Sequence, residues 1–223
     1  MPDLPTLDGP SLSPLSGGSP RHLVILLHGV GADGNDLIGL APHFAHALPD
    51  AYFVSPNAPF AYDMAPFGRQ WFSIRDFGPE TLLAGALAAA PILDTFIDAQ
   101  LTRHGLEADC LALVGFSQGT MMALQVGLRR RQPIAGILGY SGLLVGEAKL
   151  EDEIASRPPV HLIHGADDEL IPAHSLPAAV AALKSLNVPI DSHLCPNLGH
   201  GIDETGLRLG SNFLIRVLGT TDV

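Results

Sequence analysis

The sequence contains little cysteine and little lysine. Its two cysteines, Cys110 and Cys195, lie far apart and form no C-x-x-C pattern, which argues against a zinc or redox motif. Two isolated thiols fit a reducing compartment, so we expect a cytoplasmic protein. Lysine occurs at positions 149 and 184 alone, and the formal net charge is -11. This negative balance disfavours binding of nucleic acid or anionic lipid through a broad basic surface.

Long apolar runs are also missing. No stretch reaches about 18 uncharged apolar residues, so we expect no integral membrane segment. The first 21 residues hold two acids and five prolines without an apolar core, which is unlike a secretory signal. We predict that residues 1–21 form a flexible N-terminal arm and that residues 22–223 form a single domain.

Short apolar runs alternate with helix-like stretches from residue 22 onward. The predicted strands are 22–27, 51–55, 110–115, 134–140, 160–164 and 190–195. The predicted helices are 35–48, 80–104, 118–131, 173–187 and 204–218. Most strands lack polar-apolar alternation, as is typical of strands buried on both faces of a parallel sheet. The pattern therefore predicts an α/β fold with an open, mostly parallel sheet and helices on both faces.

Three residues that could form a catalytic triad each follow a predicted strand. Ser117 lies in GFSQG, between the strand CLALVG and a helix-like segment, as in a nucleophile elbow. Asp168 follows VHLIHGAD, and His200 lies in the loop after the sixth strand. Ligands bind beyond the carboxyl ends of strands in such sheets, so these positions favour one site. Ser117 would be the nucleophile, His200 its base, and Asp168 the group that orients His200.

An oxyanion hole is the remaining requirement of this chemistry. The segment LHGVGA (27–32) follows the first strand, and its glycines let backbone N–H groups turn inward. We predict that the two donors are the backbone N–H groups of Val30 and Gln118. We interpret His28 as a structural residue rather than a second base.

Six segments resemble the phospholipase/carboxylesterase group of α/β-hydrolases, which includes acyl-protein thioesterases and small bacterial carboxylesterases. They are LLHGVGADGNDL (26–37), PNAP (56–59), RQWFSI (69–74), GFSQG (115–119), HGADDELIP (164–172) and GHGI (199–202). The resemblance implies an α/β-hydrolase fold and maps the catalytic acid to Asp168 rather than Asp167. The chain departs from the group at Thr120, where a glycine is usual, and at Ser73, where an aspartate is usual.

The loop 57–78 is rich in aromatic residues and supplies the predicted substrate contacts Trp71, Phe72 and Met64. The alternative is that these side chains anchor the loop to the core.

The connection 141–159 is too short for a cap domain, so we expect an open site without one.

Ten histidines raise the question of a metal site. No further ligand is marked for His43 and His46, and His161 and His164 would point to opposite faces of a strand. We expect neither a metal nor an organic cofactor.

These observations predict a serine carboxylic-ester hydrolase that acts through an acyl-enzyme on short- to medium-chain acyl esters. One alternative is an acyl-protein thioesterase or lysophospholipase that uses the same triad, so an acylated protein or lysophospholipid could replace the small ester. A second is a non-catalytic α/β-hydrolase-fold protein that binds an apolar ligand. The resemblance also permits a homodimer.

Overall fold

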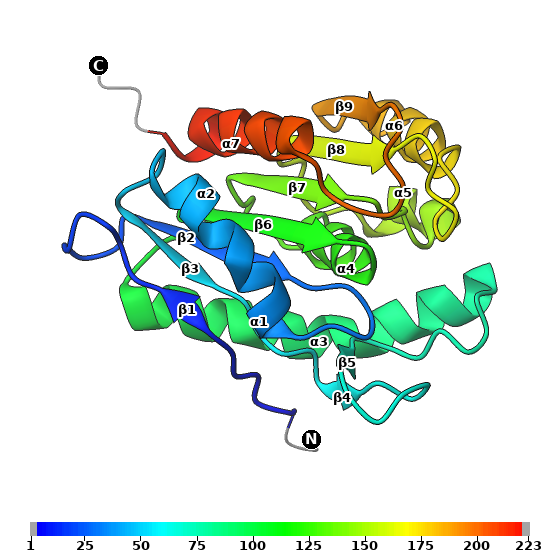
Figure 1. Ribbon diagram of the computed structural model, residues 1–223, viewed down its shortest axis with the longest axis horizontal. Helices are drawn as coiled ribbons and strands as arrows, with labels where there is room; N and C mark the ends of the chain where they lie inside the picture. Colours follow the sequence, from blue (N-terminus) through cyan, green and yellow to red (C-terminus); the bar gives the residue numbers. More distant parts are fainter. Residues whose placement is uncertain (1–3, 220–223) are drawn as a thin grey trace.

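A seven-stranded sheet forms the centre of the computed structural model, which describes residues 4–219 (Figure 1). The strand order is β1-β3-β2-β6-β7-β8-β9, and all neighbours are parallel except β1 and β3. The strands are β1 (Ser11–Leu12), β2 (His22–Leu27), β3 (Ala51–Val54), β6 (Leu111–Phe116), β7 (Gly136–Tyr140), β8 (Val160–Gly165) and β9 (Ile190–Cys195). A separate hairpin pairs β4 (Phe60–Ala61) with β5 (Arg69–Gln70).

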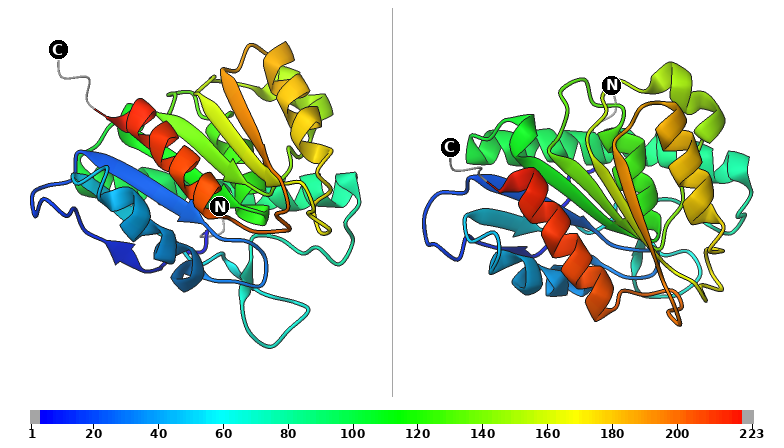
Figure 2. Two further views of the ribbon diagram at one scale, coloured as in Figure 1. Left: turned by 45° about the horizontal axis from the view of Figure 1, so that its top comes forward. Right: turned by 90° about the horizontal axis from the view of Figure 1, so that it is seen from above.

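Helices cover both faces of the sheet (Figures 1 and 2). The helices are α1 (Gly34–Leu37), α2 (Ala41–Ala45), α3 (Pro79–His104), α4 (Gln118–Gly127), α5 (Glu147–Glu153), α6 (Ser175–Ser185) and α7 (Glu204–Leu218), with short 3-10 helices at Ile38–Leu40 and Ala108–Cys110. Buried side chains of α3, α4 and α6 form the core on one face, and those of α1, α2 and α7 form the core on the other. The predicted open, mostly parallel sheet with helices on both faces is confirmed.

Strand β2 shows how one apolar run serves both cores. Leu23, Ile25 and Leu27 contribute to the core under α3 and α4, while Val24 and Leu26 contribute to the core under α7. Successive side chains of a strand point to opposite faces, so a strand covered on both sides must be apolar at every position. This requirement explains why the sequence shows a continuous run rather than an alternation.

The register of the sheet brings the predicted functional loops together. Leu27 at the end of β2 pairs with Gly115 near the end of β6, and Gly165 at the end of β8 pairs with Cys195 at the end of β9. The loops that follow these four strands therefore begin at the same edge of the sheet.

Most predicted elements are present, and one helix prediction was wrong. Residues 35–48 do not form one helix but α1, a 3-10 turn and α2. Gly39 weakens helical structure, and Pro42 is suited to the start of a new helix at α2. The connection between β7 and β8 contains the single short helix α5.

The N-terminal segment is docked along the edge of the sheet rather than free. Residues of β1 pair with β3, and Leu7 is buried in the core under α3. The backbone N–H groups of Ser55 and Asn57 donate to the carbonyls of Pro10 and Asp8. The prediction of a flexible arm was therefore wrong for this part of residues 1–21, of which 1–3 lie outside the described residues. Its prolines are compatible with an edge strand, where a missing N–H is tolerated.

Helix α3 is long and apolar enough to cross a membrane by length and composition, the one such helix among the described residues. Its side chains Ala86, Ala89 and Leu93 are buried in the core shared with α4. The helix ends at Gly105, whose φ of 65° is the left-handed conformation of a glycine cap. We therefore describe α3 as a core helix.

Docking of the N-terminal segment gives a stability prediction. We expect Leu7→Ala to lower the free energy of unfolding by about 2–3 kcal/mol, because it leaves a cavity in the core. The control Leu15→Ala removes a half-exposed side chain and should change stability by less than about 0.5 kcal/mol. Urea unfolding of both variants measures the difference; equal stabilities would show that the segment contributes nothing to the core.

Candidate active site

Ser117 lies on a strained turn between β6 and α4. Its backbone has φ 54° and ψ -117°, a combination that residues with side chains rarely adopt. The Ser117 N–H donates to the carbonyl of Tyr140 at 2.9 Å, which fixes the turn against the neighbouring strand β7. This geometry is that of a nucleophile elbow, as the GFSQG motif predicts.

Two glycines make the elbow possible. A Cβ atom at Gly119 would overlap the carbonyl oxygen of Leu27, and one at Gly115 would overlap the backbone of Thr120. Helix α4 can therefore start directly against the ends of β2 and β6. The elbow and the loop after β2 become neighbours as a result.

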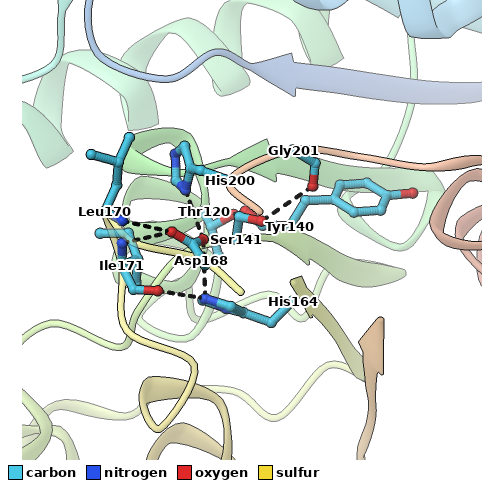
Figure 3. Close-up of polar contacts among 9 residues, drawn as sticks. All are labelled: Thr120, Tyr140, Ser141, His164, Asp168, Leu170, Ile171, His200 and Gly201. Atoms are coloured by element: carbon cyan, nitrogen blue, oxygen red, sulfur yellow. Dashed lines mark hydrogen bonds and ion pairs between the residues drawn. The ribbon is translucent and has the colours of Figure 1, made fainter. Parts of the chain in front are cut away.

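Asp168 and His200 form a hydrogen-bonded pair at the carboxyl ends of β8 and β9 (Figure 3). His200 Nδ1 lies 2.8 Å from Asp168 Oδ2, and the carboxylate is inaccessible to solvent. Asp168 Oδ1 accepts the N–H groups of Leu170 and Ile171, both at 2.9 Å. Burial acts to raise the pKa of Asp168, but the hydrogen bonds from His200 and Ile171 outweigh it and lower that pKa. Asp168 is therefore an anion that fixes the His200 ring.

A second histidine also contacts this carboxylate, and sequence reasoning considered it only as a metal ligand. The buried His164 places Nε2 2.9 Å from the Ile171 carbonyl and 3.3 Å from Asp168 Oδ2 (Figure 3). Both neighbours are acceptors, so Nε2 carries the proton. His164 therefore supports the acidic loop from strand β8.

Ser117 and His200 open onto one apolar pocket of about 310 Å³. Its lining residues are Gly29, Val30, Ala32, Ile74, Phe77, Phe116, Ser117, Gln118, Met121, Leu170, Ile171 and His200. No hydrogen bond joins Ser117 to His200 within residues 4–219, and such bonds are often long until substrate binds. The ring of His200 packs on Phe116 with centroids 4.9 Å apart. The lining contains no carboxylate and no permanent cation, which suits a neutral apolar group.

The two predicted oxyanion donors face the same pocket. Val30 and Gln118 both line it, and within the described part of the chain their backbone N–H groups have no hydrogen-bond acceptor. His28 holds the loop that carries Val30: its Nε2 accepts the Ala58 N–H at 3.0 Å, so Nδ1 donates to the Gly29 carbonyl at 2.7 Å. The interpretation of His28 as structural agrees with these contacts.

The predicted substrate contacts Trp71, Phe72 and Met64 are not supported. Trp71 and Phe72 are buried in the core under α3, and the Trp71 indole donates to the His28 carbonyl at 3.0 Å. Met64 is 59% exposed and lies outside the pocket lining. Of the loop 57–78, Ile74 and Phe77 reach the pocket instead. Composition alone could not separate the side chains that turn inward from those that form the wall.

Leu170 was also missed, although it follows the predicted acid by two residues. It is 68% exposed and lines the mouth of the pocket together with the half-exposed Phe77. A large apolar residue that is exposed directly after a catalytic acid is a signal that could have identified it.

A larger groove of about 570 Å³ lies elsewhere, between α3, α5 and α6. Its polar lining includes Glu80, Glu147 and Glu151 but neither a histidine nor a strained serine. Within residues 4–219 no three side chains of His, Cys, Asp or Glu come close enough to hold a metal ion. Chemistry rather than size therefore identifies the smaller pocket as the candidate active site.

Comparison with known proteins shows which family the chain belongs to. Residues 16–218 match the phospholipase/carboxylesterase family. The chain belongs to this family. Esterase YpfH of Escherichia coli (strain K12) is 29% identical over 195 residues, which cover 87% of this chain and 82% of the relative. Acyl-protein thioesterase 1 of Schizosaccharomyces pombe is 30% identical over 158 residues, which cover 67% of this chain and 70% of the relative.

Solved structures show the same relationship. Esterase PE8 superposes with a TM-score of 0.92 at 42% identity, covering 96% of this chain and 100% of that one. A carboxylesterase from Mesorhizobium loti shares the fold, with a TM-score of 0.75 at 24% identity and 96% coverage of each chain. These comparisons confirm the predicted family and the predicted α/β-hydrolase fold. They also confirm the prediction of a hydrolase of the carboxylesterase and thioesterase class.

Thr120, where a glycine is usual in the phospholipase/carboxylesterase group, is accommodated by two other glycines. Its hydroxyl donates to the Tyr140 carbonyl at 2.8 Å (Figure 3). A Cβ atom at Gly139 or Gly142 would overlap the Thr120 side chain. The Thr120 side chain thus fills the space beside Gly139 and Gly142. Its hydroxyl joins α4 to the end of β7, where the Tyr140 carbonyl also accepts the Ser117 N–H.

The histidine of the oxyanion loop gives a pH prediction. Burial lowers the pKa of His28, although its bond to the Gly29 carbonyl opposes the shift. Below about pH 6.5 the His28 imidazole takes up a proton in the unfolded chain but not in the folded chain. His28 therefore lowers the free energy of unfolding as the pH falls. We expect wild type to be more stable than His28→Gln at pH 7.5, and that difference to shrink toward pH 5.

Urea unfolding at several pH values measures this effect, whose slope is at most about 1.4 kcal/mol per pH unit for one group. Burial also lowers the pKa of other histidines, such as His161. Wild type and His28→Gln share these other histidines, so the difference in stability between the two proteins does not contain their contribution. A difference that stays constant from pH 7.5 to 5 would contradict a neutral, buried His28.

Proposed function

We propose that this protein hydrolyses carboxylic esters through an acyl-enzyme on Ser117. The observation that carries the proposal is the strained Ser117 turn, which opens on the same apolar pocket as the hydrogen-bonded pair of His200 and Asp168. Retention of all three groups favours an enzyme over a non-catalytic ligand-binding protein of the same fold.

The proposed reaction proceeds in two half-reactions. Ser117 Oγ attacks the ester carbonyl carbon while its proton passes to His200 Nε2, and the N–H groups of Val30 and Gln118 bind the oxyanion. Collapse of this intermediate breaks the bond to the leaving group, which takes the proton from His200. Water then attacks the acyl-enzyme with His200 as base, and the carboxylic acid leaves from a regenerated serine. No step requires a metal or an organic cofactor.

The pocket supports an acyl group of short to medium length. Its volume of about 310 Å³ corresponds to roughly ten water molecules, and its walls are apolar. The same pocket would accept an acyl thioester or a lysophospholipid, and one relative is named an acyl-protein thioesterase. We propose a small-molecule ester as the substrate. We also propose the cytoplasm as the compartment, because both cysteines are free.

Labelling with a fluorophosphonate probe tests the nucleophile. Folded wild-type protein should form a covalent adduct on Ser117, and Ser117→Ala should lose both the adduct and ester hydrolysis while its circular dichroism is unchanged. Absence of an adduct on Ser117 in folded wild-type protein would contradict the proposal.

Two neighbouring aspartates provide a matched control for the acid. Asp168→Asn should lower kcat by about 10⁴-fold, because the amide selects the wrong His200 tautomer. Asp167→Asn should have little effect, since the carboxylate that contacts His200 is that of Asp168. A reversed ranking would mean that the acid is wrongly assigned.

The pocket also gives a prediction about acyl-chain length. Met121 lines it and is buried, so a larger side chain there should shorten the space for the acyl group. We expect Met121→Phe to lower kcat/KM for p-nitrophenyl decanoate by about 10-fold more than for the butanoate. Met64→Ala should leave the chain-length profile unchanged, because Met64 lies outside the pocket. An unchanged profile in Met121→Phe would place the acyl group elsewhere.

A further inference from the structure

The side chain of Gln118 is buried beside the proposed nucleophile, where sequence reasoning considered only its backbone N–H. It is 1% exposed, and its two polar atoms are both engaged by the loop 57–78. Oε1 accepts the Trp71 N–H at 2.8 Å, and Nε2 donates to the Phe72 carbonyl at 2.8 Å. A backbone N–H can only donate and a carbonyl can only accept, so these partners allow one orientation of the amide.

This pair of bonds continues into the oxyanion loop. Trp71, whose backbone is held by Gln118, donates its indole N–H to the His28 carbonyl at 3.0 Å. Further along the same segment, the Gly31 N–H donates to the Arg69 carbonyl and the Arg69 N–H donates to the Ala32 carbonyl, both at 2.8 Å. The turn that carries Val30 is thus attached to a loop that Gln118 attaches to the elbow.

One residue therefore connects both halves of the proposed oxyanion hole. The backbone N–H of Gln118 is one donor, and its side chain restrains, through Trp71, the turn that presents the other donor at Val30. Hydrogen bonds in a buried site are geometrically demanding, because an unpaired partner has no water to replace it. A donor displaced from the oxyanion position loses stabilisation that exists only in the transition state.

We propose that the Gln118 side chain is a positioning residue that sets the Val30 N–H relative to the Gln118 N–H. The inference rests on the proposed ester hydrolysis and adds a role to the same site. It requires that loss of the amide lower kcat and leave KM nearly unchanged, because ground-state contacts of the acyl group lie on other side chains of the pocket.

Gln118→Met and Gln125→Met form a matched pair for the test. Both replace a buried glutamine of α4 by an apolar side chain of similar length, but the Gln125 amide has no hydrogen-bond partner within residues 4–219. We expect Gln118→Met to lower kcat by about 10- to 100-fold with KM changed less than about twofold. Gln125→Met should retain wild-type kcat.

An inhibitor comparison separates positioning from general destabilisation. Affinity for an alkyl trifluoromethyl ketone, whose serine adduct carries an oxyanion, should fall by the same factor as kcat in Gln118→Met. Affinity for the product carboxylate of the same chain length should be unchanged. Equal losses for both ligands, or wild-type kcat in folded Gln118→Met, would overturn the inference.

A second variant serves if Gln118→Met does not fold. Trp71→Phe removes the indole N–H that reaches the His28 carbonyl, and it should give the same selective loss of kcat and ketone affinity. Unchanged kcat in folded Trp71→Phe would also overturn the inference. Wild-type protein with neither esterase activity nor a fluorophosphonate adduct would instead overturn the proposed function.

Discussion

The close approach of α4 to the ends of β2 and β6 is the constraint on which the rest of the site depends. Gly119 lies against the Leu27 carbonyl, where no side chain fits, and the chain reaches this position through the strained backbone of Ser117. Helix α4 is buried at every position, so the elbow cannot relax without disturbing the core. The same approach brings the Gln118 N–H beside the loop that presents Val30. Nucleophile geometry and the proposed oxyanion hole are therefore two consequences of one packing contact.

The carboxyl edge of the parallel sheet explains why so much of the site could be predicted from sequence. Strands β2, β6, β8 and β9 are in register and end at that edge, so the residues that follow them converge whatever their separation in the chain. Continuous apolar runs locate the central strands β2 and β6, whereas the edge strand β9 contains polar residues. Ser117, Asp168 and His200 could be placed by counting from the ends of the predicted strands. In the structure, Asp168 and His200 lie in hydrogen-bond contact at 2.8 Å.

The pocket wall was harder to predict because long-range contacts decide it. Whether a side chain of the loop 57–78 faces the core or the pocket depends on the backbone at Trp71 and Phe72, which Gln118 binds from 46 to 47 positions away. No local pattern encodes this bond, and an aromatic-rich loop suits either arrangement. The N-terminal segment illustrates the same limit: two paired residues and one buried leucine dock a stretch whose composition resembles a free arm.

The formation of an acyl-enzyme on Ser117 can be tested directly. The experiment is acid-quenched turnover of a p-nitrophenyl ester, followed by mass spectrometry of the digested protein. We predict an acyl group on the peptide that contains Ser117, formed with a burst of p-nitrophenol equal to the concentration of active sites. An acyl group on another residue, or hydrolysis with neither a burst nor any covalent species, would contradict it.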